Sequence, residues 1–276
     1  MMKKTIIRTL KIIGLALILF IALFPLFWMF ITSGKSMTEL LKIPVTLWPE
    51  KFSFASYYEV WIQKPFPKYI INSLKISIVA TILGMLVSSM AAYGFAKFRF
   101  PLKRVILMFV LVAQMFPSTS IIIPLFSTYR SYGLYDTHVG LMLLYTTISL
   151  AFSIWMMYGY FRGVPKELEE AARIDGCGPF KIFTKVILPI SKPGIAAVGV
   201  YSFMCAWNEY LYSLILLTSE DRYTISIGLS RFITEFGTYW NQMGAASIIV
   251  TIPTLIIFLL LGKNLIEGLT AGAVKG

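Results

Sequence analysis

The chain has 276 residues, of which 57% are hydrophobic and only 14% are charged, and its mean hydropathy is +0.75. A water-soluble domain of this length needs a far more polar surface, so the composition predicts that much of the surface faces lipid. Two cysteines exclude a disulfide framework, and the single histidine, His138, excludes a histidine-based metal cluster within the chain. We therefore expect no metal site and no cofactor.

Six apolar segments are each long enough to cross about 30 Å of hydrocarbon as a helix. Their predicted ranges are 12–32, 72–96, 105–127, 138–160, 194–217 and 243–262. The first follows a basic stretch, as the core of a secretory signal would, but its length of about 21 residues exceeds such a core and no small-x-small cleavage pattern follows. The prediction is an all-α membrane protein with about six transmembrane helices, the first of them retained.

The basic residues are distributed unevenly over the connecting segments. Sixteen Lys and Arg residues lie in segments 1–11, 97–104, 161–193 and 263–276, and eight lie in segments 33–71, 128–137 and 218–242. This asymmetry predicts that the first set is cytoplasmic, so both termini are expected on the cytoplasmic side. It also accounts for the net charge of +12 without nucleic acid, because no basic stripe interleaved with aromatic residues is present.

These segments predict three parts of the chain. Residues 1–67 would form the first transmembrane helix and an external loop. Residues 68–262 would form the transmembrane core, with a large cytoplasmic loop at 161–193, and residues 263–276 would form a cytoplasmic tail.

The cytoplasmic loop is predicted to begin with a short helix over about 165–175. Pro165 suits the first position of a helix, and Gly176 supplies a left-handed stop. Glu169 and Arg173 have the i,i+4 spacing of a favourable ion pair.

A second short helix is expected after this turn. Phe180, Phe183 and Ile187 would form its apolar face, and Pro189 and Pro193 would end it. The residues alone leave two interpretations open: a docking element for another protein, or an amphipathic interfacial loop whose charges are only solvated.

A motif in this loop resembles that of a known family. The order Glu170-Ala171-Ala172, Asp175-Gly176, nine residues and then Val186-Ile187-Leu188-Pro189 is similar to the EAA loop of permease subunits in binding-protein-dependent ABC importers. The family usually has Ile where this chain has Val186. In that family the loop docks on a cytoplasmic ATPase, so the resemblance implies ATPase coupling by seven residues, namely Glu170, Ala171, Ala172, Asp175, Gly176, Leu188 and Pro189.

Two further stretches, Trp207 to Leu211 and Gly268 to Gly276, resemble the smaller permease subunit of maltose-type sugar importers. The resemblance implies a type I ABC importer permease fold in the cytoplasmic membrane of a prokaryote, and ATP-driven import of a sugar or oligosaccharide. Another solute, such as a glycerophosphodiester or a peptide, stays an alternative. The implied partners are a pair of cytoplasmic ATP-binding subunits, a second and non-identical permease subunit, an external solute-binding protein and membrane lipid.

Polar side chains within the apolar segments are candidates for a translocation path. Asn208 and Glu209 lie in the fifth segment, and Gln114 and Ser118 lie in the third at a similar depth. Amide, carboxylate and hydroxyl groups beside aromatic rings suit a neutral, hydroxyl-rich solute, and a carboxylate at this depth must face protein or water. The alternative is that Glu209 only fixes helix packing, through a hydrogen bond to the partner permease.

Signs of an enzyme are missing from the sequence. Gly34-Lys35-Ser36 mimics the end of a phosphate-binding loop, but Met29 stands where that motif needs Gly. No nucleophile–base constellation is apparent, so ATP hydrolysis is expected in a separate chain. A proton- or sodium-coupled carrier would need several intramembrane ionisable groups, whereas only Glu209 is deep. An insertase-like structural protein would leave the Ala-rich cytoplasmic helix unexplained.

Overall fold

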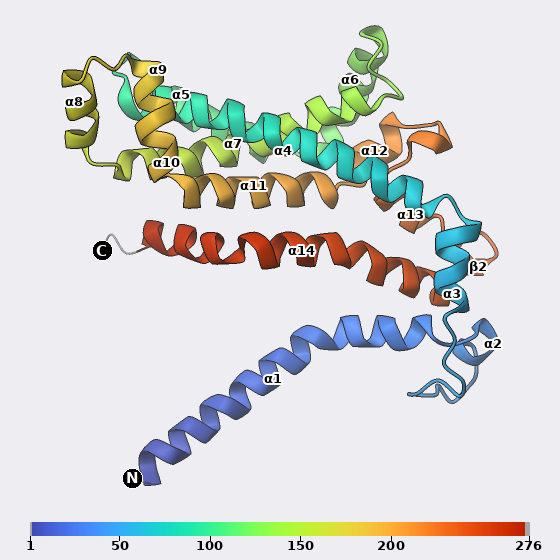
Figure 1. The fold of residues 1–276 in the computed structure, drawn as a ribbon. Helices are drawn as coiled ribbons and strands as arrows, with labels where there is room; N and C mark the ends of the chain where they lie inside the picture. Colours follow the sequence, from blue (N-terminus) through green and yellow to red (C-terminus); the bar gives the residue numbers. More distant parts are fainter. Residues whose placement is uncertain (1, 274–276) are drawn as a thin grey trace. The chain divides into compact units, whose positions relative to one another are not determined.

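The structure is a computed structural model that describes residues 2–273, with side chains described for residues 7–262. It is almost entirely helical (Figure 1). Contacts between residues divide the chain into two units, one formed by residues 1–67 and 228–252 and the other by residues 68–227 and 253–276. The sequence ending at 268–276, which carries part of the sugar-importer resemblance, lies outside the described side chains.

The first unit contains α1 (Met2–Ser33), α2 (Met37–Leu40), α3 (Ala55–Tyr58) with the π-turn η1 (Glu59–Gln63), and the start of α14 (Trp240–Ala273). A small antiparallel hairpin, β1 (Ile233–Thr234) and β2 (Gly237–Thr238), pairs Ile233 with Thr238. The close approach of α14 to α1 depends on Gly244, because a Cβ there would lie 2.9 Å from the Met29 carbonyl oxygen.

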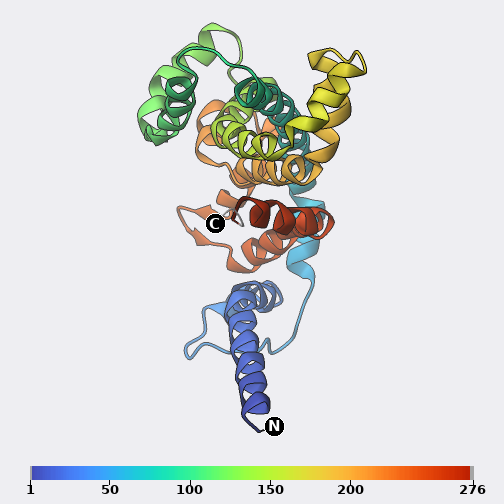
Figure 2. The same cartoon turned by 90° about the vertical axis from the view of Figure 1, so that its left-hand side faces the viewer.

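The second unit is built on three helices that run side by side, α4 (Phe66–Lys97), α7 (His138–Gly163) and α11 (Lys192–Trp207) (Figure 2). Small side chains allow their close packing. A Cβ on Gly84 of α4 would lie 3.2 Å from Ser149 Oγ, and the hydroxyls of Ser153 and Ser202 are 3.4 Å apart. Small and hydroxyl-bearing residues at helix contacts are typical of membrane bundles, where packing and hydrogen bonds replace the hydrophobic effect.

Most other helices of this unit lie at the two ends of the bundle (Figure 1), whereas α5 (Lys103–Val112) contacts α7. One end carries α8 (Lys166–Ile174), α9 (Pro179–Ile182), η3 (Phe183–Ile187) and α10 (Leu188–Ile190). The other carries α6 (Ser118–Ser131), α12 (Leu211–Leu216), η4 (Glu220–Arg222) and α13 (Ile225–Ser230). Since α7 has 26 residues, its ends are roughly 39 Å apart at 1.5 Å per residue, so the two groups are separated by about the thickness of a bilayer.

Within residues 7–262, four helices are long and apolar enough to cross a membrane, namely Ile7–Ser33, Phe66–Lys97, His138–Gly163 and Trp240–Gly262. The number reaches the predicted six only when two bent pairs each count as one span. The predicted third helix is not continuous, because Lys103–Met115 and Ser118–Ser131 meet at 95°. Pro117 lies at this bend, where proline disfavours a helical conformation of the residue before it.

The fifth prediction, a continuous helix over 194–217, is also wrong. Helix α11 ends at Trp207 and α12 begins at Leu211. The carboxylate of Glu209 accepts hydrogen bonds from the first turn of α12, so a side chain replaces the backbone carbonyl groups that a continuous helix would supply. The bent pair in this region instead joins Pro179–Ile190 to α11 at 81°.

Candidate functional site

The first candidate site is the docking element, which we define as residues 165–188. Helix α8 begins at Lys166, directly after Pro165, so the predicted start at the proline is one residue early. Its end has the hydrogen bonds of a Schellman motif: Cys177 N–H donates to the Ala172 carbonyl at 2.9 Å, and Gly176 N–H donates to the Arg173 carbonyl at 3.0 Å. Gly176 has φ +77°, which confirms the predicted left-handed stop.

An apolar cluster fixes the docking element to the bundle. Ile182, Phe183 and Ile187 are buried against residues of α4, α7 and α11. The ring of Tyr93 in α4 lies 4.9 Å from that of Phe183, and the Tyr93 hydroxyl donates a hydrogen bond of 3.2 Å to the Pro179 carbonyl. The fully buried Phe161, near the end of α7, belongs to the same cluster. The docking element is therefore packed against all three helices.

Two details of the predicted element are wrong. Phe180 is 72% exposed, so the buried face consists of Phe183 and Ile187 without it. The second short helix does not end at Pro189, because α10 includes this residue and continues to Ile190. Pro193 lies in the first turn of α11, where the missing amide hydrogen of proline has no helical partner to lose.

Glu169 binds to α4 rather than within its own helix. Its carboxylate forms an ion pair with the Lys97 ammonium, at the last residue of α4, and not with Arg173 as the spacing predicts. The side chains of Lys97 and Glu169 are 11% and 7% exposed. The i,i+4 pattern is favourable only for an exposed helix, whereas tertiary packing turns Glu169 inward.

The outer face of the docking element is open and mixed in character. Of the seven residues predicted to couple to an ATPase, Glu170, Ala171, Asp175 and Gly176 are exposed and lie together around the end of α8. Ile174 adds an apolar side chain that is 87% exposed. The other three lie apart from this group: Ala172 is buried against the bundle, Leu188 is half-buried and Pro189 is exposed in α10.

The second candidate site surrounds Glu209, at the break between α11 and α12. Its carboxylate accepts hydrogen bonds from the Tyr145 hydroxyl at 2.7 Å, from Tyr212 N–H at 2.8 Å and from Ser213 N–H at 3.1 Å. The first amide groups of a helix lack backbone partners, and in a membrane they must be satisfied by protein. All three partners belong to this chain, so no second subunit is needed to hold the carboxylate.

The other path candidates lie near this break without forming one cluster. Tyr212 of α12 lies three residues after Glu209, and its hydroxyl is 3.5 Å from the Ser118 carbonyl oxygen at the start of α6. Gln114 donates its side-chain amide to the Ile148 carbonyl of α7 at 2.9 Å, and Asn208 donates to the Met204 carbonyl of its own helix at 2.9 Å. Gln114, Ser118 and Asn208 are exposed, whereas Glu209 is half-buried.

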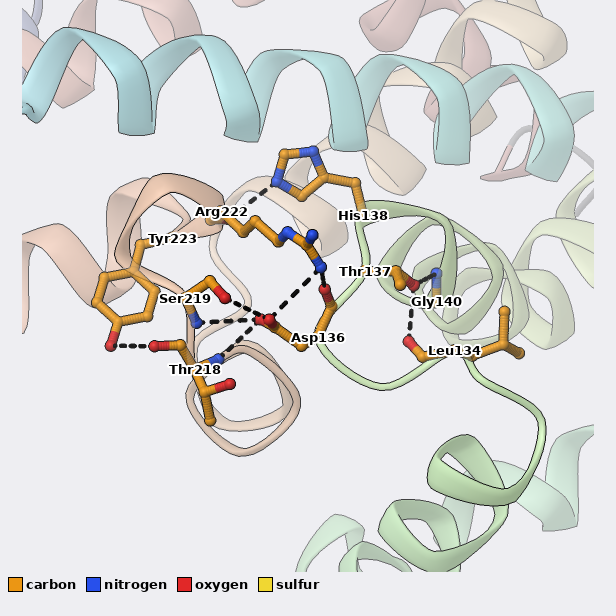
Figure 3. A network of polar contacts seen from close by, with 9 residues as sticks. All are labelled: Leu134, Asp136, Thr137, His138, Gly140, Thr218, Ser219, Arg222 and Tyr223. Atoms are coloured by element: carbon orange, nitrogen blue, oxygen red, sulfur yellow. Dashed lines mark hydrogen bonds and ion pairs between the residues drawn. The ribbon is translucent and has the colours of Figure 1, made fainter.

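A third polar site, centred on Asp136, is one that the sequence analysis did not identify (Figure 3). One carboxylate oxygen of Asp136 accepts hydrogen bonds from Thr218 N–H at 3.0 Å and Ser219 N–H at 3.1 Å, and the other accepts one from Ser219 Oγ at 2.5 Å. The Arg222 guanidinium contacts both the carbonyl and the carboxylate of Asp136. Burial alone would raise the pKa of Asp136, but these hydrogen bonds and Arg222 together hold it below its usual 3.8.

The same segment is fastened to α4 and α7. Asn72 of α4 donates its amide to the carbonyl groups of Asp221 and Tyr223, each at 3.0 Å, and Ser73 Oγ accepts a hydrogen bond of 2.8 Å from Ile225 N–H. Nε2 of His138, the first residue of α7, lies 3.0 Å from the Arg222 carbonyl oxygen. The partners are more than 80 residues apart in sequence, so local patterns do not identify this corner.

Among the residues whose side chains are described, no group of three or more His, Cys, Asp or Glu is close enough to hold a metal ion. The three sites instead offer an exposed helical face, a capped helix break and a polar corner held by hydrogen bonds. None of them assembles a nucleophile with a base.

Comparison with known proteins identifies the class of this fold. The fold is similar to a chain of a bacterial ABC transporter involved in the import of the acidic polysaccharide alginate, with a TM-score of 0.80 over 95% of this chain and 97% of that one, at 24% identity. The fold is therefore that of an ABC importer permease. Residues 80–270 match the family model of binding-protein-dependent transport system inner membrane components, and the chain belongs to this family.

Curated relatives cover the whole length. The chain is 34% identical to the inner membrane ABC transporter permease protein YcjP of Escherichia coli (strain K12), over 99% of each chain. It is 35% identical to the trehalose/maltose transport system permease protein MalG of Thermococcus litoralis, over all of both chains. It is 34% identical to the arabinooligosaccharides transport system permease protein AraQ of Halalkalibacterium halodurans, again over all of both. The predicted class, an inner-membrane ABC permease, is confirmed.

Proposed function

We propose that this permease carries a sugar or oligosaccharide inward across the membrane, and that the docking element (165–188) couples it to a separate ATP-hydrolysing subunit. The names of the trehalose/maltose and arabinooligosaccharide permeases, matched over full length, support a sugar as solute. The observation that carries the coupling proposal is structural. The docking element exposes one face to a partner and is attached by its other face to α4, α7 and α11.

The attachment explains how movement would pass from an ATPase to the membrane helices. A partner that binds around Ile174 and Glu170 applies its force to α8, and the Lys97–Glu169 ion pair passes that force to the end of α4. The cluster around Phe183 passes it to α7 and α11. A well-packed interface of this kind transmits a displacement rather than absorbing it. ATP binding and hydrolysis in the partner would then alternate the access of the path.

The assembly we propose has the partners that the sequence indicates. Two cytoplasmic ATP-binding subunits would dock on the docking element and its counterpart, and a second, non-identical permease would complete the path. Both termini would be cytoplasmic. An external solute-binding protein would contact segments 33–71 and 218–242, where the Asp136–Arg222 corner supplies a fixed support. The charge distribution of the loops supports this orientation.

We propose that the path runs past the break between α11 and α12. The exposed polar groups of Gln114, Ser118 and Asn208 would contact the solute. The contacts of Glu209 support a different role: its carboxylate holds the break open and so shapes the path. Glu209 would then act on transport through helix geometry and not through its charge.

A charge reversal tests the coupling proposal. Glu170→Lys should leave membrane insertion intact but reduce ATP-dependent uptake at least tenfold, because an exposed docking face tolerates the substitution in the isolated chain and not in the complex. The matched control is Lys192→Glu, an exposed charge reversal at the start of α11 outside the docking element. Copurification of the ATP-binding subunit reports docking directly. Normal copurification and uptake with Glu170→Lys would refute the assignment.

A further inference from the structure

The joint between α4 and α5 (Lys103–Val112) gathers positive charge at one end of the bundle. Arg99, Lys103 and Arg104 line a cavity of about 460 Å³. Three apolar residues complete its wall, namely Phe100, Leu102 and Val105. The cavity belongs wholly to the second structural unit, and none of its lining residues belongs to the docking element or to the break at Glu209.

Within the described part of the chain, no ion pair neutralises the two arginines of this cavity. The carboxylate of Glu169 is already bound by Lys97. A fourth cation is close by, because Lys103 and Arg162 each lie 5.7 Å from the centre of the Tyr158 ring. Like charges held together repel one another unless an anion joins them.

The cavity is held in place by contacts to the bundle. The Trp155 indole N–H donates a hydrogen bond of 2.9 Å to the Leu107 carbonyl, which fixes α5 on α7. The Phe100 ring lies 5.7 Å from that of Phe95 in α4. Lys103 also donates to the Phe98 carbonyl at 3.4 Å. The cations are therefore presented from a defined backbone rather than from a loose tail.

An exposed apolar surface continues from the cationic rim along α5. Leu102 is 69% exposed, Met108 63% and Phe109 68%. The joint connects two membrane-crossing segments, so its cations lie where lipid headgroups lie and the apolar surface faces the hydrocarbon. Cationic groups at the interface with an apolar surface below them match the two parts of a phospholipid.

We propose that this cavity binds the phosphate headgroup of an anionic phospholipid, with its acyl chains along the exposed face of α5. Arg99 and Arg104 bind the phosphate, since a guanidinium forms two parallel hydrogen bonds to phosphate oxygens. Phe100, Leu102 and Val105 contact the glycerol and the upper acyl carbons. A zwitterionic lipid binds less tightly because its own positive group is repelled by the same cations.

The test is native mass spectrometry of the purified transport complex titrated with phosphatidylglycerol or phosphatidylcholine. We expect phosphatidylglycerol to bind at least tenfold more tightly than phosphatidylcholine. The double variant Arg99→Gln/Arg104→Gln should weaken phosphatidylglycerol binding about tenfold or more, since each cation near the membrane surface contributes substantially. Arg99→Lys/Arg104→Lys should bind with an affinity between those of the wild type and the Gln variant, because the positive charges are retained but the paired guanidinium hydrogen bonds are lost.

The matched control is Arg8→Gln/Lys11→Gln, which removes two exposed cations of α1 that lie outside both the cavity and the docking element. It should change phosphatidylglycerol binding less than about twofold, a small part of what two cations at the headgroup contribute. Equal loss in the control and the test variant would overturn the proposal, as would equal binding of the two lipids. If millimolar inorganic phosphate displaced phosphatidylglycerol completely, the cavity would be a site for free phosphate, which would also overturn the proposal. The Arg99→Gln/Arg104→Gln variant could instead bind lipid normally and lose a partner subunit from the complex. This result would identify a protein interface and would overturn the proposal.

Discussion

The Tyr145 hydroxyl donates a hydrogen bond of 2.7 Å to the carboxylate of Glu209, which joins the middle of α7 to the break between α11 and α12. The same carboxylate caps α12 through Tyr212 and Ser213. One acidic side chain therefore accepts hydrogen bonds both from a neighbouring helix and from the backbone amides at the start of α12. This arrangement gives a structural reason for a carboxylate at membrane depth without a role in proton transfer.

Glu209→Gln should lower the thermal stability of the protein and should change uptake little. The amide oxygen accepts hydrogen bonds more weakly than a carboxylate, and the NH2 group that replaces the second oxygen cannot accept from a backbone N–H, so a loss of about 1–2 kcal/mol is expected. Thermal unfolding of the purified complex measures this loss. Tyr145→Phe, which removes one donor only, should cost less. Lost uptake with unchanged thermal stability would show instead that the charge of Glu209 acts in the path.

Gly176→Ala should weaken the docking element through the backbone alone. A Cβ at Gly176 meets nothing within 4 Å, but the φ of +77° costs an L-residue about 1–2 kcal/mol. Gly178→Ala is the matched control, because a Cβ there also meets nothing and φ is −71°. Gly176→Pro should abolish uptake, since proline fixes φ near −65°. Hydrogen exchange of the amides over 166–178 measures the difference, and equal protection in the two Ala variants would contradict it.

The Lys97–Glu169 ion pair should show strong energetic coupling. Both side chains are nearly buried, so removing one partner leaves an uncompensated charge, and Glu169→Met or Lys97→Met alone should cost about 3 kcal/mol. The double variant Lys97→Met/Glu169→Met should recover much of this loss, because no isolated charge stays buried. A double-mutant cycle of unfolding free energies and uptake checks both statements. Additive losses would show that the two residues act independently.

Asp136 should make the polar corner that it forms with Arg222 sensitive to acid. Because its pKa in the folded protein is lower than in the unfolded chain, the unfolded state binds more protons and stability rises with pH in this range. The stabilisation should be present above about pH 4, the unperturbed value, and should be lost as pH falls further. Unfolding measured between pH 3 and 6 should show this loss in the wild type. Asp136→Asn should be less stable at pH 6 and should lack this component, whereas an unchanged pH profile would contradict the assignment.

Composition and local sequence pattern determined several features of this protein, namely its membrane-crossing segments, the turn of the docking element and its family. Apolar length located the membrane-crossing segments, because a helix needs about 20 apolar residues to cross hydrocarbon. Gly176 marked the turn of the docking element, since only a residue tolerant of positive φ suits that stop. The arrangement of Glu170, Ala171 and Ala172 before it was enough to indicate the permease family. These features depend on neighbours within a few residues.

Only the tertiary structure decided which partners the polar side chains find. Glu169 pairs with Lys97, 72 positions away in the sequence, instead of its neighbour Arg173, and the carboxylate of Glu209 replaces the backbone at a break that apolar length does not reveal. Arg222 donates a hydrogen bond to Asp136, although the two residues are 86 positions apart in the sequence. A charged group that is buried or close to lipid needs a partner that compensates its charge, and that partner is set by how helices pack rather than by spacing along the chain.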